Sequence, residues 1–487
     1  MRVITGESDA PRTTDDEYVR RVLRYRPSSL VPWIARVGAQ YSGVGSWENG
    51  DYTRFNPWAL SDIARVSLVG GSEFLRDATR NDLLQCAEEY RNLLDPELGT
   101  DEPDAAARFL LRIGYEQLLF RQSLKGEIAR NIALFEQTQP SRPLTVIRPG
   151  WDQELLGCRL SQYAGIGFCV YAVATQHQGQ FSTSWFDAPE LQFVTSHIPV
   201  ALMGGVLDHE FTGDRDYYRS FADANEPSPY RRFGYNPLVG RPVVRLNNQL
   251  LVPVPLQVIR KISPVGLWYA GFDRWGNSFA EDVGYLFEQY VGRVLRTIPD
   301  AWVYPEVSYD PNGNKRSVDW IVVWDNVVLL VEVKSTRSTQ SIRMGTAQGW
   351  IDLKGRLGRA YTQIATTSDL ISQGHSKFSH IPKDVPRIGL ILTMEPFPFI
   401  DARVMRDMIG VTPSVPMRVC SISDLEWLVC LPDRGVGEHL LELMTDPAKE
   451  GWEVLGQEFA EVEFAPSTVL DQAWSAFSWS PGVGLSA

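Results

Sequence analysis

The stretch that most constrains the fold is RSVDWIVVWDNVVLLVEVKSTR, residues 316–337. Two apolar runs, 318–324 and 327–333, flank the pair Asp325-Asn326. Asp and Asn tolerate the positive φ angles of a tight turn, and apolar runs of this length are typical of buried strands. The pattern therefore predicts a β-hairpin with a two-residue loop.

A two-residue loop also fixes which residues of the hairpin face each other. It places Asp319 directly opposite Glu332, and Lys334 lies on the same face because side chains alternate along a strand. Two facing carboxylates repel each other, and a divalent cation that prefers oxygen ligands would offset the repulsion. In the alternative interpretation, Asp319 and Lys334 are solvated ends of their strands, and Glu332 forms an ion pair with Lys334 only. The strand around Glu332 is too apolar for one wet face, so we favour a metal site.

Asp319, followed on the next strand by Glu332-Val333-Lys334, resembles the signature of the PD-(D/E)XK nuclease superfamily, which includes many restriction enzymes and Holliday-junction resolvases. Val318 stands where the family usually has Pro before the Asp. The resemblance covers residues 276–431, less than half of the chain, and is specific only at superfamily level.

The resemblance implies an α/β domain with a mixed sheet flanked by helices, and metal-dependent hydrolysis of phosphodiester bonds by an endonuclease. Asp319, Glu332 and the Val333 carbonyl would hold one or two Mg²⁺ ions, for which Mn²⁺ can substitute. Lys334 would position the attacking water or help to deprotonate it. The implied substrate is DNA more often than RNA, and fusion to a further region suggests a restriction or antiviral defence role.

Two further residues enter as catalytic candidates through the resemblance. The apolar spacing predicts a helix from residue 278, and its GYLFEQYVGRVL segment is similar to the family's first helix, whose Glu reaches the metal; the match falls on Glu288. Glu281 has another explanation, as part of a capping box with Ser278. Gln363, on a helix predicted over 347–371, is the other candidate, because some branches place a Gln there.

The net charge of −12 argues against a protein with a broadly basic surface, so nucleic-acid binding requires a local basic patch. Between residues 334 and 360 there are six basic residues and one acidic residue. This local reversal of charge suits phosphate binding. For any single basic residue among the six, a place on a solvated helix face is the simpler interpretation. Besides Lys334, the candidates are Arg337, Arg343, Lys354, Arg356 and Arg359.

The length of 487 residues suits two or three domains. We expect a mainly helical α+β region over 1–270, in one or two subdomains and with a recognition or regulatory role, a nuclease-like domain over 271–450, and an extension over 451–487. Within the first region, Asn247-Asn248 predicts another two-residue hairpin, and 144–147 a short strand.

The remaining composition excludes other classes of site. The five cysteines and six histidines show no metal-ligand spacing, and no apolar signal core begins the chain. The longest apolar stretch, 165–175, is too short to span a bilayer. We therefore expect a soluble cytoplasmic protein whose partners are nucleic acid, a partner protein or further copies of itself, and no membrane. Two alternatives are an inactive nuclease-fold module that binds nucleic acid or acts as a scaffold, and a sensor whose main activity lies in the N-terminal region.

Overall fold

The computed structural model shows a chain of mixed helix and sheet that divides into two compact units. No helix in the described part combines the length and the apolar character needed to cross a membrane. The first unit consists of Met1–Glu102, Leu156–Ile262 and Trp479–Ala487, and the second of Pro103–Leu155 and Ser263–Ser478. The residues described are 12–42, 55–95, 104–118, 123–221, 231–335, 339–397, 399–410, 414–431, 435–451, 453–455 and 464–480.

The first unit is mainly helical and contains a four-stranded sheet in the order β1-β4-β3-β2. The hairpin predicted at Asn247-Asn248 is confirmed, because these two residues adopt φ angles of 48° and 62° and Leu246 pairs with Gln249. The elements are α1 (Asp15–Val22), α2 (Pro27–Gln40), α3 (Pro57–Gly70), α4 (Arg80–Arg91), α8 (Leu160–Gln176), β1 (Gln180–Phe181), η2 (Thr183–Asp187), η3 (Pro189–Leu191), α9 (Gln192–Thr195), α10 (Val200–Val206), η4 (Leu207–Phe211), β2 (Thr212–Gly213), α11 (Arg215–Arg219), η5 (Arg231–Phe233), β3 (Val243–Leu246), β4 (Gln249–Leu251) and α12 (Leu256–Ile262).

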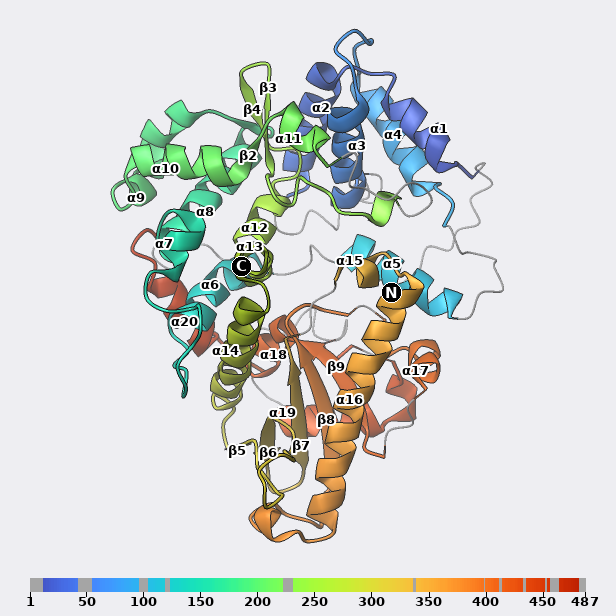
Figure 1. Ribbon diagram of the computed structural model, residues 1–487, viewed down its shortest axis with the longest axis vertical. Helices are drawn as coiled ribbons and strands as arrows, with labels where there is room; N and C mark the ends of the chain where they lie inside the picture. The colour runs from blue at the N-terminus through green and yellow to red at the C-terminus, as the bar shows by residue number, and fades with distance from the viewer. Residues whose placement is uncertain are drawn as a thin grey trace. The chain divides into compact units, whose positions relative to one another are not determined.

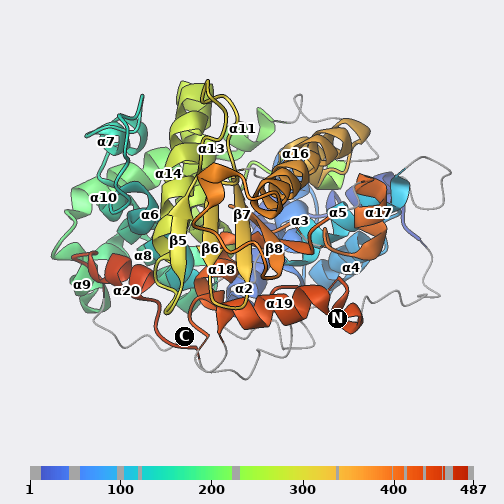
Figure 2. The ribbon, with the colours of Figure 1, turned by 90° about the horizontal axis from the view of Figure 1, so that it is seen from below.

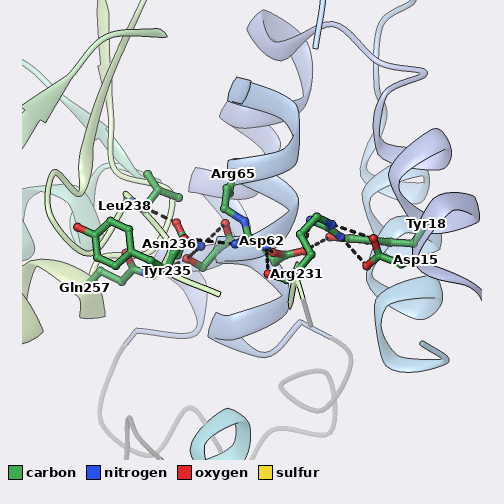
Figure 3. Close-up of polar contacts among 10 residues, drawn as sticks. Asp15, Tyr18, Asp62, Arg65, Arg231, Tyr235, Asn236, Leu238 and Gln257 are labelled. Carbon is green, nitrogen blue, oxygen red and sulfur yellow. Dashed lines mark hydrogen bonds and ion pairs between the residues drawn. The ribbon is translucent and has the colours of Figure 1, made fainter. Parts of the chain in front are cut away.

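A buried polar network crosses the first unit at α3 (Figure 3). Asp62 accepts a hydrogen bond from the Tyr18 hydroxyl at 2.8 Å and forms an ion pair with Arg65. Arg231 donates two hydrogen bonds of 2.9 Å to Asp15 and lies 3.7 Å from Asp62. Because each of these charges has an opposite charge beside it, we interpret the network as one that fixes segments far apart in the sequence.

The second unit contains a five-stranded mixed sheet in the order β5-β6-β7-β8-β9. Figure 2 shows β5, β6, β7 and β8 side by side in this order. The strands β5, β6 and β7 are antiparallel, whereas β7, β8 and β9 are parallel and are joined by helical crossovers. The elements are α5 (Ala105–Leu118), α6 (Leu124–Phe135), α7 (Trp151–Leu156), α13 (Pro264–Trp275), α14 (Asn277–Leu295), β5 (Trp302–Pro305), β6 (Trp320–Val323), β7 (Val328–Lys334), α15 (Gln340–Arg343), α16 (Ala347–Ser372), η6 (Ser376–Phe378), β8 (Arg387–Thr393), α17 (Arg403–Ile409), β9 (Met417–Ser421), α18 (Ile422–Leu428), α19 (Val436–Thr445), η7 (Pro447–Lys449) and α20 (Thr468–Ser475).

The sheet lies between α14 and α16, as Figure 1 shows. A Cβ atom on Gly292 of α14 would lie 2.1 Å from the Trp320 ring, so glycine is needed for this close packing. The Trp320 indole also donates a hydrogen bond of 3.0 Å to the Glu288 carbonyl. From the other side, Ile364 of α16 packs against Gly389 of β8. These contacts fix both helices against the strands that carry the candidate residues.

The segment before α7 is bound to α14 through hydrogen bonds from its backbone N–H groups. The buried Asp282 carboxylate of α14 accepts the N–H groups of Thr145, Val146 and Ile147 at 2.7–3.0 Å. The prediction of a strand over 144–147 is therefore wrong, because a side chain binds the N–H groups that a strand would offer to a neighbour.

The two units differ from the predicted domains. Residues 103–155 belong with the second unit although the prediction placed them in the region 1–270, and the second unit resumes at Ser263, before the predicted boundary. The predicted extension over 451–487 is also divided, because α20 packs on α6 while Trp479 belongs to the first unit.

Candidate active site

The predicted hairpin and its register are confirmed. Trp320 pairs with Val331 and Val323 with Val328, with Asp325-Asn326 as the loop. Beyond Trp320 the strand pairing ends, and the Asp319 side chain accepts a hydrogen bond of 2.6 Å from the Val333 N–H. Asp319 is therefore held against the end of β7.

A third carboxylate, which the sequence pattern did not reveal, extends this arrangement. Pro305 of β5 and Trp320 of β6 are the last pair of their ladder, and Glu306 and Asp319 are the next residues beyond this pair, so Glu306 lies beside Asp319. Glu306, Asp319 and Glu332 thus form a row across three neighbouring strands, which we call the carboxylate row. The charge of Glu306 contributes to the raised pKa of both Asp319 and Glu332. No local signal identifies Glu306, because the connection 306–319 is too long to fix a register.

Glu332 is 1% exposed, and its two oxygens differ in their contacts. Oε1 accepts a hydrogen bond from the Lys334 ammonium group. The alternative to a metal site expected this ion pair. Oε2 is buried and has no hydrogen-bond partner among the described residues. A buried carboxylate oxygen without a partner is costly, so this atom is suited to receive a cation.

Burial raises the pKa of both Asp319 and Glu332. The Asp319 charge raises the pKa of Glu332 further, whereas Lys334 lowers it. The hydrogen bond from the Val333 N–H lowers the pKa of Asp319 and so opposes the effect of burial. The facing pair thus retains a proton more readily than exposed carboxylates do, because the single charge of Lys334 does not balance two buried carboxylates.

Glu288 lies on α14, near the carboxylate row. Burial, and then the charges of Asp319 and Glu306, raise its pKa to about 7. A carboxyl group with this pKa exchanges protons near neutral pH. Glu281 is exposed, and its expected capping box with Ser278 does not form, because α14 begins at Asn277 after Gly276. The geometry therefore brings Glu288 to the site, although the predicted helix cap is wrong.

Gln363 occupies a different place from the one its catalytic role requires. Its side-chain amide donates a hydrogen bond of 2.8 Å to the Ser317 carbonyl. One turn later on α16, the Thr367 hydroxyl accepts the Val318 N–H at 3.1 Å. Both contacts fix the backbone directly before Asp319, so the Gln363 side chain positions the segment that carries Asp319.

The predicted basic patch is divided by the structure. Arg343 is buried and forms an ion pair of 2.9 Å with Glu395, so the expectation that it binds nucleic acid is wrong. Lys354 lies 3.8 Å from Asp104. Arg359 is exposed on α16 and Arg356 partly exposed. Arg337 lies outside the described residues.

A groove of about 920 Å³ adjoins the carboxylate row. Glu306, one member of the carboxylate row, lines the groove together with Glu288. Its other lining residues come from α14, from the segment before α7 and from the ends of the strands, and they include Ser141, Arg142, Tyr285, Arg316 and Ser335.

No group of three or more His, Cys, Asp or Glu side chains within the described ranges is arranged to hold a metal ion. The donors that are present are the carboxylates of Asp319 and Glu332, and the latter includes the Oε2 atom without a partner. Mg²⁺ is commonly bound through one or two carboxylates with water in its other positions. The donor chemistry of these two carboxylates is therefore of the kind that a hard cation prefers.

The raised pKa values predict that the metal-free protein loses stability as pH rises. A carboxyl group whose pKa is higher in the folded state binds more protons there, so its contribution is lost as pH passes through the folded pKa. For Glu288, with a pKa of about 7, and for the facing pair, this window runs from about pH 4, near the ordinary carboxyl pKa, to about pH 8. We expect a fall on the order of 2 kcal/mol in the unfolding free energy.

Urea unfolding in EDTA at several pH values measures this fall. Glu332→Gln should flatten the pH dependence, whereas Glu281→Gln, an exposed change on the same helix as Glu288, should leave it as in the wild type. An equal slope in the wild type and the Glu332→Gln variant would contradict the assignment.

Compared with family models, curated proteins and solved structures, the chain has no significant match in any of the three.

Proposed function

We propose that the second unit is a metal-dependent nuclease of the PD-(D/E)XK type that hydrolyses phosphodiester bonds, in DNA in preference to RNA. The observation that carries the proposal is the facing pair of Asp319 and Glu332, with its buried, unpartnered oxygen, next to a polar groove. The order α14, β5, hairpin, α16, β8 in a mixed sheet also supports a restriction-endonuclease-like fold.

Asp319, Glu332 and the Val333 carbonyl are the groups that would hold Mg²⁺ or Mn²⁺. When bound, such an ion polarises the scissile phosphate and lowers the pKa of a coordinated water. Lys334, already beside Glu332, would orient the attacking water and offset the charge that develops on the phosphate. Glu288, with its pKa of about 7, can accept or donate a proton at its carboxylate oxygens near the groove.

The test uses the intact chain with supercoiled plasmid and with an RNA of similar length. We expect nicking in Mg²⁺ or Mn²⁺, its complete loss in EDTA, and faster cleavage of DNA than of RNA. An inactive binding or scaffolding module would bind the plasmid and leave it uncut with either metal. That result would refute the proposal. A restriction or defence role is part of the same proposal and is tested by plating efficiency of phage on cells that express the chain.

A further inference from the structure

The groove beside the carboxylate row contains two guanidinium groups that the charge pattern of the sequence did not single out. Arg142 comes from the segment before α7, and Arg316 lies three residues before Asp319. Three glutamates, at positions 281, 288 and 306, line the same groove. Any phosphate that enters therefore meets these two cations among carboxylates.

Arg142 is held in the groove without being neutralised. It is exposed, and its guanidinium carbon lies 4.3 Å from the centroid of the Tyr285 ring. No carboxylate among the described residues pairs with it. A cation–π contact orients the group but leaves its full charge and its N–H donors available to an anion.

The backbone that carries Arg142 is fixed at two points. The Tyr285 hydroxyl accepts the Ser141 N–H at 3.0 Å, and the buried Asp282 carboxylate binds three N–H groups a few residues later. Both anchors lie on α14, the helix that carries Glu288. The position of Arg142 relative to the candidate active site is therefore set by the helix itself.

Arg316 occupies the side of the groove next to the carboxylate row. Its guanidinium lies 2.9 Å from Glu306, yet 60% of its side chain is exposed. An exposed ion pair of this kind is weak, so a phosphate can displace the carboxylate. Ser335, which follows β7 directly, also lines the groove.

We propose that Arg142 and Arg316 bind the phosphates of a single nucleic-acid strand and so guide it to the carboxylate row. This rests on the proposed function of the second unit. Two guanidinium groups and one aromatic ring in a concave groove match the pattern of single-strand binding, in which cations follow one backbone and bases stack on flat side chains. A duplex carries twice the phosphate charge along its length and needs a wider basic surface than this groove offers.

The experiment measures fluorescence anisotropy of a labelled 20-nucleotide DNA strand and of its duplex with the intact chain. Ca²⁺ replaces Mg²⁺ so that binding is observed without cleavage. The variants are Arg142→Ala, Arg316→Ala and Arg316→Lys. The control is Arg403→Ala, which removes an exposed cation on α17 outside the groove.

We expect the wild type to bind the single strand more tightly than the duplex. Each groove Arg→Ala variant should weaken single-strand binding by about five- to twentyfold and reduce the slope of log Kd against log salt by about 0.7. Arg316→Lys should recover part of the loss, and Arg403→Ala should behave as the wild type.

The outcomes separate this inference from the proposed function. Unchanged binding in both groove variants, or tighter binding of the duplex, overturns the single-strand groove even if the wild type cleaves DNA in Mg²⁺. Reduced binding in both variants, without cleavage by the wild type, supports the groove and refutes the nuclease.

Discussion

Replacing Glu332 by Gln is expected to reduce metal-dependent cleavage by at least about a thousandfold, which corresponds to about 4 kcal/mol of transition-state stabilisation. Gln has nearly the same shape but lacks the charge that a cation needs. The substitution also removes the repulsion between Glu332 and Asp319, so the free energy of unfolding should not fall by more than about 1 kcal/mol. Asp319→Asn and Lys334→Ala should show losses of similar size.

Single-turnover rates with excess protein measure this loss, and thermal unfolding confirms that the variants are folded. Glu281→Gln is the matched comparison, since it removes an exposed carboxylate of α14 that lines the groove but lies outside the carboxylate row, and at saturating protein it should stay within about threefold of the wild-type rate. Glu288→Gln should fall between the two. Wild-type cleavage by Glu332→Gln would show that the facing pair is not the active site.

The second large effect concerns Arg130 of α6, which forms a buried ion pair with Glu426 of α18. Its guanidinium donates two hydrogen bonds of 2.6–2.7 Å to this carboxylate, and the Tyr290 hydroxyl donates another of 2.6 Å. Arg130→Met would leave Glu426 buried without a cation, which costs about 3–5 kcal/mol. That is a large share of the stability of an ordinary domain.

Chemical denaturation of the intact chain measures the effect of Arg130→Met. Arg403→Ala, which breaks an exposed pair with Asp407, should change the unfolding free energy by less than about 0.5 kcal/mol. A fragment of residues 271–487 lacks α6 and therefore Arg130, the partner of the buried Glu426. This fragment should not unfold cooperatively. A soluble fragment with the midpoint of the intact chain would show that α6 is dispensable.

The sequence was informative where a short turn links the interacting residues. Asp325-Asn326 fixes the register of its hairpin, and Asn247-Asn248 does the same in the first unit, since a two-residue loop allows only one pairing. The pairing of Asp319 with Glu332 therefore follows from the amino-acid order alone.

What the sequence could not show depends on contacts between distant residues. The partner of Arg343 is Glu395, 52 residues away, so a basic residue that belongs to the interior appeared to belong to a surface patch. The assignment of 103–155 failed for the same reason. Its helices have ordinary amphipathic patterns, and only contacts such as those of Arg130 and Asp282 show which unit they belong to.

The ion pair between Arg130 and Glu426 also determines when the second unit can be completed during synthesis. Its two members are 296 residues apart, and ribosomes add about 5–20 residues per second, so Arg130 waits roughly 15 to 60 s for Glu426. During that interval α6 carries a charge that it cannot bury. A chain released early, before residue 426, never obtains the pair, so incomplete translation products lack a folded second unit and any activity that belongs to it.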